Sequence, residues 1–174
     1  MKIERRKITP PKDEHAMMDL PFKLIVMIIL IGAVIPSSVI GYRNISRVRF
    51  EKDIEAELND LVFMSRCLSR EGNSSSCKIE VDLDGNIFAS IDHVQIGSSI
   101  DEYCRLIRYR FSWKRSSSSM IVDDPSVKLT SPQNSTLRLS GRTQVLYMTH
   151  LVVNDDSFIL ISKNSKNIDL DQFY

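Results

Sequence analysis

The sequence predicts an α+β protein in which a long N-terminal transmembrane helix is followed by an antiparallel β-sandwich-like head domain. Three observations carry this prediction. The 19 residues from Leu24 to Tyr42 include no charged side chain. A helical spacing of apolar residues then continues to about residue 70. After Gly72 the spacing changes to the alternation that is typical of strands.

The uncharged stretch has the length of a membrane span. At about 1.5 Å of rise per residue it covers roughly 28 Å, close to the roughly 30 Å hydrocarbon core of a bilayer. Phe22 and Tyr42 lie at its ends, where interfacial aromatic residues are expected. Pro36 removes a helical hydrogen bond, so we expect a kink there, with Ser37 and Ser38 bonding back to backbone carbonyls. The alternative, a buried core helix, normally has a polar face that this segment lacks.

The net charge of +1 over 174 residues hides an uneven distribution. Residues 1–23 carry six basic and four acidic side chains, whereas residues 43–174 carry 17 basic and 18 acidic ones. This balance argues against a nucleic-acid-binding surface, and 43% hydrophobic residues argue against a disordered chain. The basic excess before the span favours a cytoplasmic N-terminus and an outside C-terminal domain, although basic residues among 43–52 weaken that bias.

The helix is expected to continue beyond the bilayer. Residues 43–70 contain no Pro or Gly, and Gly72 is a natural terminator. Apolar and small residues recur at three- and four-residue steps, which predicts one buried face made of Ile54, Leu58, Leu61, Ser65 and Leu68. The chain then divides into a cytoplasmic leader (1–20), a transmembrane helix (21–42), an amphipathic helical extension (43–71), an extracytoplasmic β-domain (72–165) and a tail (166–174).

The β-domain is predicted from short alternating segments. The clearest strand places Ile107, Tyr109, Phe111 and Trp113 on one face and basic residues on the other. Asp84-Gly85-Asn86 predicts a hairpin turn between strands over 78–83 and 88–96. Further strands are expected over 120–122, 127–130, 136–139, 143–153 and 158–162. Six to eight short strands with no helix between them indicate an antiparallel sandwich or a strongly curved sheet.

The basic face of the clearest strand is a candidate partner-binding surface. Its residues are Arg108, Arg110 and Lys114. They suit an acidic partner subunit, an anionic glycan or lipid headgroups. The alternative is a solvated strand face whose basic side chains have acidic partners across the strands.

Two further sets of residues fit an outside location. Asn44, Asn73 and Asn134 each begin an N-glycosylation acceptor sequence, and all three follow the apolar run. Cys67 and Cys77 flank a turn-like stretch, so a disulfide between them would fasten the end of a helix to the start of a strand. The alternative is three free thiols, in which Cys104 is a buried apolar residue.

No motif predicts catalysis, so we expect that the protein is not an enzyme. His15, His93 and His150 lack neighbouring ligands at metal spacing, and there is no phosphate-binding glycine loop or nucleophile elbow. We therefore expect no catalytic residue, no metal and no cofactor. Acidic pairs such as Asp123-Asp124 would suit calcium, but the preference of Asp for turns explains them equally well.

The order of these segments resembles that of archaeal type IV pilin-like proteins. Such proteins have a short charged leader, an apolar helix that continues as an amphipathic helix, and a β-rich head. The junction resembles that of archaeal pilins and archaellins, and its sequence is Asp13-Glu14-His15-Ala16-Met17-Met18-Asp19-Leu20-Pro21. The resemblance implies cleavage by a prepilin peptidase that leaves Ala16 or Met17 as the new N-terminus. Asp19 then stands for the acidic residue near the start of the mature helix.

The resemblance implies a structural role: a membrane-anchored surface or filament subunit whose partners are the membrane and copies of itself or other pilin-like subunits. Nucleic acid is not an expected partner. The alternative is an uncleaved single-pass surface protein whose β-domain binds a partner or ligand. Conventional signal-peptidase cleavage after Gly41 is a further alternative.

Overall fold

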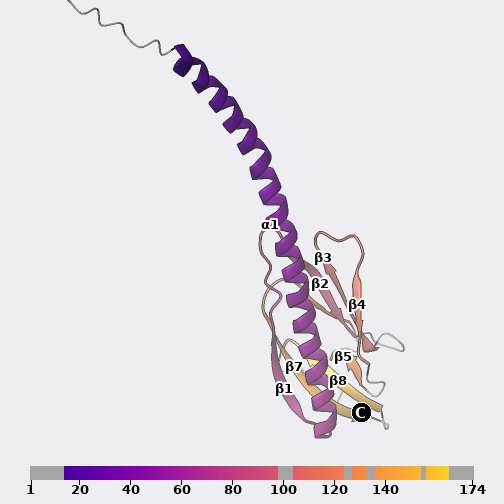
Figure 1. The fold of residues 1–174 in the computed structure, drawn as a ribbon. Helices are drawn as coiled ribbons and strands as arrows, with labels where there is room; N and C mark the ends of the chain where they lie inside the picture. Colours follow the sequence, from indigo (N-terminus) through magenta and orange to yellow (C-terminus); the bar gives the residue numbers. More distant parts are fainter. Residues whose placement is uncertain (1–13, 98–103, 124–126, 133–135, 154–155, 165–174) are drawn as a thin grey trace, which may run out of the picture. The chain divides into compact units, whose positions relative to one another are not determined.

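The computed structural model describes residues 14–97, 104–123, 127–132, 136–153 and 156–164, with side chains described from residue 21 onward. The fold is α+β, as predicted. In the described part of the chain one helix, α1 (Glu14–Glu71, 58 residues), precedes eight strands in two four-stranded sheets (Figure 1). The chain divides into two compact units, Met1–Tyr42 and Arg43–Tyr174.

In the first unit, α1 passes through two prolines without interruption. Pro21 and Pro36 both lie inside the helix. The hydroxyl of Ser37 donates a 2.8 Å hydrogen bond to the carbonyl oxygen of Ala33, which is the back-bond expected from the sequence. Every side chain from Pro21 to Ile40 is exposed, so this stretch has no buried face within the chain.

In the second unit, the rest of α1 has a continuous buried face. All five residues predicted for that face are buried, and the complete buried row is Ser46, Phe50, Ile54, Leu58, Leu61, Val62, Ser65 and Leu68. The helix ends at Glu71 because Gly72 adopts a φ of +106°, a conformation that favours glycine. The helical spacing of the apolar residues therefore predicted the buried face, and Gly72 predicted its end.

The first sheet has the order β1-β7-β8-β5, where the strands are β1 (Ser76–Val81), β7 (Gln144–Val153), β8 (Asp156–Ser162) and β5 (Lys128–Thr130). The second has the order β4-β3-β2-β6, with β4 (Ser118–Ile121), β3 (Leu106–Phe111), β2 (Ile91–Ile96) and β6 (Leu137–Leu139). One pair departs from the predicted antiparallel pairing, because β5 and β8 run parallel. β5 reaches its sheet by a crossover from β4 of the other sheet, so no hairpin fixes its direction.

The predicted hairpin at Asp84-Gly85-Asn86 is wrong. β1 and β2 lie in different sheets, and the tight turn lies slightly later, where Asn86 and Ala89 form an isolated antiparallel bridge. Gly85 is needed for a different reason. A Cβ at this position would lie 2.4 Å from the carbonyl oxygen of Ala89, so only glycine allows the backbone to approach so closely.

One hydrophobic core joins the helix of the second unit to both sheets. Part of this core is a cluster of aromatic rings that includes Phe50, the first buried apolar residue of the helix after Arg43. The ring centroids of Phe50 and Phe111 are 6.1 Å apart, and those of Phe111 and Trp113 are 4.8 Å apart in a stacked arrangement. Figure 1 shows the purple-to-magenta part of α1 running alongside the strands of both sheets. The part of α1 that begins at Arg43 is thus packed into the β-domain and shares its core.

Candidate functional site

The most distinctive functional feature is the bare apolar surface of residues 21–42. In the described part of the chain, α1 is long and apolar enough to span a membrane, and the side chains of its most apolar stretch are not buried within the chain. A signal sequence near the N-terminus would meet the same test of length and composition. The large exposed apolar side chains here are Phe22, Leu24, Ile25, Val26, Met27, Ile28, Ile29, Leu30, Ile31, Val34, Ile35, Val39, Ile40 and Tyr42.

Such a surface is unfavourable in water. Each exposed Leu, Ile or Phe side chain forfeits about 1.5–3 kcal/mol relative to burial, and apolar patches of this size mark contact with membranes or other apolar partners. Nothing in the described part of the chain covers these side chains. The surface is therefore suited to lipid or to other apolar helices.

The basic face of β3 is largely neutralised within the chain. Arg110 pairs with Asp92, and the ammonium of Lys114 pairs with Glu51 of α1. Arg108 is exposed on the same face, opposite Gln95 of β2. Arg110 and Lys114 therefore have intramolecular acidic partners, which agrees with the alternative of a strand face that has its own acidic partners. Their role in binding another molecule stays a prediction.

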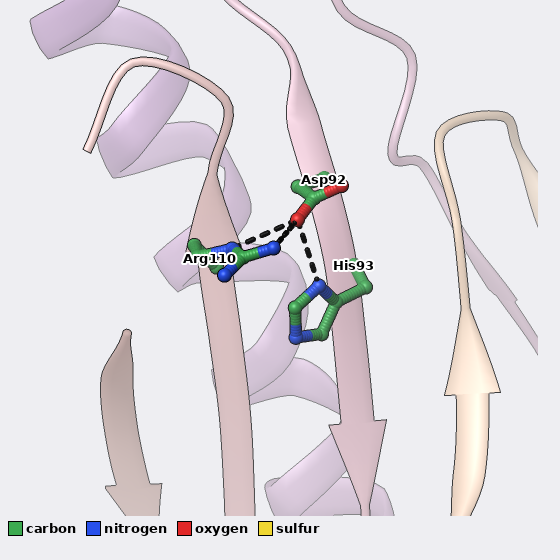
Figure 2. Close-up of polar contacts among 3 residues, drawn as sticks. All are labelled: Asp92, His93 and Arg110. Atoms are coloured by element: carbon green, nitrogen blue, oxygen red, sulfur yellow. Dashed lines mark hydrogen bonds and ion pairs between the residues drawn. The ribbon is translucent and has the colours of Figure 1, made fainter. Parts of the chain in front are cut away.

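Asp92, His93 and Arg110 form a polar cluster on this face, with Asp92 at its centre (Figure 2). The guanidinium of Arg110 donates through Nε over 2.8 Å to Oδ2 of Asp92, and a second guanidinium nitrogen donates to the same oxygen. Nδ1 of His93 lies 3.0 Å from that oxygen and donates to it, because a carboxylate only accepts. These bonds, first from Arg110 and then from His93, lower the pKa of the Asp92 carboxyl.

A β-bulge brings this cluster together. In the pairing of β2 with β3, Ile91 is opposite Phe111 and His93 is opposite Arg110, so Asp92 is an extra residue. A bulge turns two consecutive side chains toward one face. This cluster was not predicted, although the sequence holds a signal for it: apolar residues at 91, 94 and 96 break the strict alternation of a regular strand.

His150 has a structural position at the end of the helix. Its Nδ1 donates to the carbonyl oxygen of Gly72 over 2.8 Å, and its Nε2 lies 2.8 Å from the hydroxyl of Ser157. The backbone of β7 pairs with the same segment, because Ser74 N donates to His150 O and His150 N donates to Ser75 O. This histidine therefore ties the C-terminal end of α1 to two strands of the first sheet.

Cys67 and Cys77 are not joined by a disulfide in this structure, and the bond expected between them stays a prediction. Cys67 lies in the last turns of α1, and Cys77 lies in β1. Burial, together with the nearby carboxylate of Glu71, raises the pKa of the Cys77 thiol. At neutral pH this thiol is therefore protonated and slow to react.

Of the predicted glycosylation and processing residues, two have described side chains, and both of these are exposed. Asn44 is exposed on α1, and Asn73 is exposed beyond its end, where Oδ1 accepts a hydrogen bond from Val152 N. Asn134 lies outside the described residues. Ala16, Met17 and Asp19 lie in the first turns of α1, in a stretch whose side chains are not described.

Among the described residues, no group of three or more His, Cys, Asp or Glu side chains is placed to hold a metal ion. Two of the acidic turn residues, Asp82 and Asp123, have other partners. Asp82 accepts hydrogen bonds from Asp84 N and from the hydroxyl of Thr143, and Asp123 pairs with Arg66 at 3.3 Å. These bonds are the turn-forming and ion-pairing roles typical of surface aspartates.

Comparisons with protein-family models, curated proteins and solved structures found no match to this chain. The order and type of the structural elements therefore indicate function here. A long apolar N-terminal helix followed by two β-sheets is consistent with a type IV pilin-like architecture.

Proposed function

We propose that the protein is a pilin-like, membrane-anchored structural subunit, with residues 21–42 in the membrane and the β-domain outside the cell. The observation that carries the proposal is the change in burial along a single helix. Residues 21–40 are all exposed, whereas the part of α1 after Arg43 has a complete buried face. The first stretch therefore depends on an environment outside its own chain.

The proposal is of a structural role without catalysis. The two histidines whose side chains the structure describes have hydrogen-bond partners that fit a structural role: Asp92 for His93, and Gly72 with Ser157 for His150. In a pilin-like assembly, the exposed apolar helices of several copies pack against one another, which covers the surface that this chain leaves bare.

Mass spectrometry of the N-terminus of the native, membrane-extracted protein tests the pilin part of the proposal. A chain that begins at Ala16 or Met17 supports processing by a prepilin peptidase. An intact Met1 contradicts it and favours an uncleaved single-pass anchor whose β-domain binds a partner. A chain that begins at Tyr42 identifies the apolar stretch as a removed signal sequence and contradicts anchoring altogether.

The proposed orientation has its own test. Replacement of Asn44, Asn73 and Asn134 by Gln should abolish a gel mobility shift if glycans are attached outside the cell. Proteolysis of intact cells supplies an independent readout that does not need glycans. Protection of the β-domain until the cells are permeabilised would contradict the outside location.

Lys23 tests self-assembly. It is the charged residue next to the apolar stretch, at a position where helices packed in lipid disfavour charge. The variant Lys23→Leu should increase the fraction of crosslinked multimers in membranes, with Lys52→Leu on the extension as the control. An unchanged multimer fraction would contradict packing through this part of the helix.

A further inference from the structure

The turn from Asn86 to Ala89 presents an apolar side chain at its apex. Ile87 is 91% exposed, the highest value among the described large hydrophobic residues. Turn apices normally carry Gly, Asn, Asp or Ser, which suit both the backbone and water. Isoleucine suits neither the backbone of a turn nor contact with water, so its exposed position at the apex is unusual.

This turn is firmly ordered. Asn86 N donates to Ala89 O over 2.7 Å, and Oδ1 of Asn86 accepts hydrogen bonds from the amides of Phe88 and Ala89, both at 2.9 Å. The close approach of Gly85 to the Ala89 carbonyl further restricts the backbone. Ile87 therefore stays at the apex of a fixed turn, and an apolar contact there needs little further ordering of the backbone.

The turn is fastened to the beginning of the second unit's helix. Nδ2 of Asn86 donates to the hydroxyl of Ser46 over 2.9 Å, and Nε of Arg47 donates to Phe88 O over 3.2 Å. Ser46 follows Tyr42, the last residue of the uncharged span, by only four residues, or about 6 Å of helical rise. The turn thus lies beside the helical residues that immediately follow the proposed anchor.

The charges along α1 are unevenly distributed, and the basic ones lie in the segment to which this turn is bonded. Residues 43–52 carry four basic side chains and one acidic one, a net charge of +3, whereas residues 53–71 carry five acidic and two basic ones, a net charge of −3. The loop after β3 adds Lys114, which pairs with Glu51, and the exposed Arg115. The turn that carries Ile87 is thus bonded to a basic segment of the helix, and the combination of an apolar side chain with basic residues is typical of segments that lie at a lipid interface with anionic headgroups.

We infer that the turn Asn86–Ala89 inserts the side chain of Ile87 into the surface of the membrane that holds residues 21–42, with the exposed basic residues of 43–52 and Arg115 on the lipid phosphates. This inference rests on the proposed membrane anchor. It adds a second point of membrane contact, contributed by the β-domain, and identifies the partner of that contact as an anionic lipid surface.

Photocrosslinking to lipid tests the inference in the full chain. p-Benzoylphenylalanine is introduced at position 87, 31 or 121 in three separate variants, which are reconstituted in vesicles of phosphatidylcholine and phosphatidylglycerol. Ile121 is the matched control, because it is 59% exposed but lies two residues from Asp123, which pairs with Arg66. Arg66 is 20 residues beyond Ser46, or roughly 30 Å along the helix.

We expect lipid adducts at positions 31 and 87, with at least a fivefold lower yield at position 121. Adducts at 31 but equal, low yields at 87 and 121 would overturn the inference and leave the anchor intact. Absence of adducts at 31 would overturn the anchor itself, and the inference with it. High and equal yields at all three positions would indicate collision with vesicles, and would also overturn the inference.

The lipid charge supplies a second measurement. In vesicles of phosphatidylcholine alone, the yield at position 87 should fall severalfold while the yield at position 31 stays constant. Equal yields at position 87 in both kinds of vesicle would overturn the assignment of the basic residues to lipid phosphates. Because Ile87 is exposed, the variant is expected to fold, and the unfolding curve of each variant verifies this.

Discussion

Residues 21–42 and residues 43–71 form one uninterrupted helix, yet they depend on different surroundings. The first stretch exposes its apolar side chains on all sides, whereas the second buries one row of them against both sheets. Each stretch also contains a serine that bonds to the carbonyl four residues earlier at 2.8 Å: Ser37 to Ala33 and Ser65 to Leu61. The backbone hydrogen bonding is the same in both stretches, whereas the pattern and the burial of their side chains differ.

This comparison separates helix formation from helix placement. Both stretches are helical because their backbones bond internally, but the pattern of their side chains decides what surrounds them. A uniformly apolar stretch needs lipid or similar helices on every side. An amphipathic stretch needs a partner on one side only, and here the β-domain supplies it.

Truncation of one leucine in the buried row should have the largest effect on the β-domain. Leu58 is fully buried, so Leu58→Ala should lower the free energy of unfolding by about 2–5 kcal/mol through lost burial and a cavity. The matched variant Ile31→Ala, in the exposed stretch, should leave it unchanged. Denaturant unfolding of the full chain in detergent, followed by Trp113 fluorescence, measures both. Equal losses would refute the division between the two stretches.

A charge in the first stretch should impair membrane insertion. Arginine near the middle of a spanning helix costs about 2.5–3.5 kcal/mol, so Ile31→Arg should move a large part of the protein out of the carbonate-resistant membrane fraction. Phe63→Arg is the control, since Phe63 is an exposed large apolar residue on the second stretch. Retention of both variants in the membrane fraction would argue that residues 21–42 are not an anchor.

The two serines give a smaller and more direct comparison. Ser65→Ala removes a buried hydroxyl and its bond to Leu61, and should cost about 1 kcal/mol of β-domain stability. Ser37→Ala removes the equivalent bond in the exposed stretch and should not alter β-domain stability. The same unfolding measurement reads both variants. A change with Ser37→Ala would mean that the stability of the two stretches is coupled.

Acidification should lower the stability of the β-domain and leave membrane retention unchanged. The pKa of Asp92 is lowered by Arg110 and His93, so its stabilising contribution is complete above the unfolded value of about 3.9 and is lost as the pH falls through the lowered pKa. Wild type should therefore be more stable than Asp92→Asn at pH 7, and this difference should shrink by pH 3. Membrane retention should not change, because residues 24–42 carry no charge. A pH-independent difference between the two proteins would contradict this role of Asp92.

The sequence was sufficient for features that repeat along one element. The buried row from Ile54 to Leu68, the helix end before Gly72 and the alternation of β3 each follow from spacing or from one residue's backbone preference. The back-bond of Ser37 also follows, because donor and acceptor are four residues apart.

Features that depend on contacts between distant segments could not be predicted in the same way. Asp84-Gly85-Asn86 has the composition of a hairpin turn, but the chain crosses to the other sheet there because β1 pairs with β7. The Asp92 cluster depends on a bulge that adjusts β2 to β3. The neutralisation of Lys114 depends on Glu51, 63 residues away.

The hydrogen bonds at Gly72 have a mechanical consequence. The chain enters the sheets only after the helix has passed along the whole buried row, and His150 and Ser75 hold that far end. A force that pulls Arg43 along the helix axis therefore acts to slide the helix past the sheets. All the core contacts of the helix from Phe50 to Leu68 resist this sliding at the same time. Loading of this kind gives a domain far more resistance to force than peeling its contacts apart one by one.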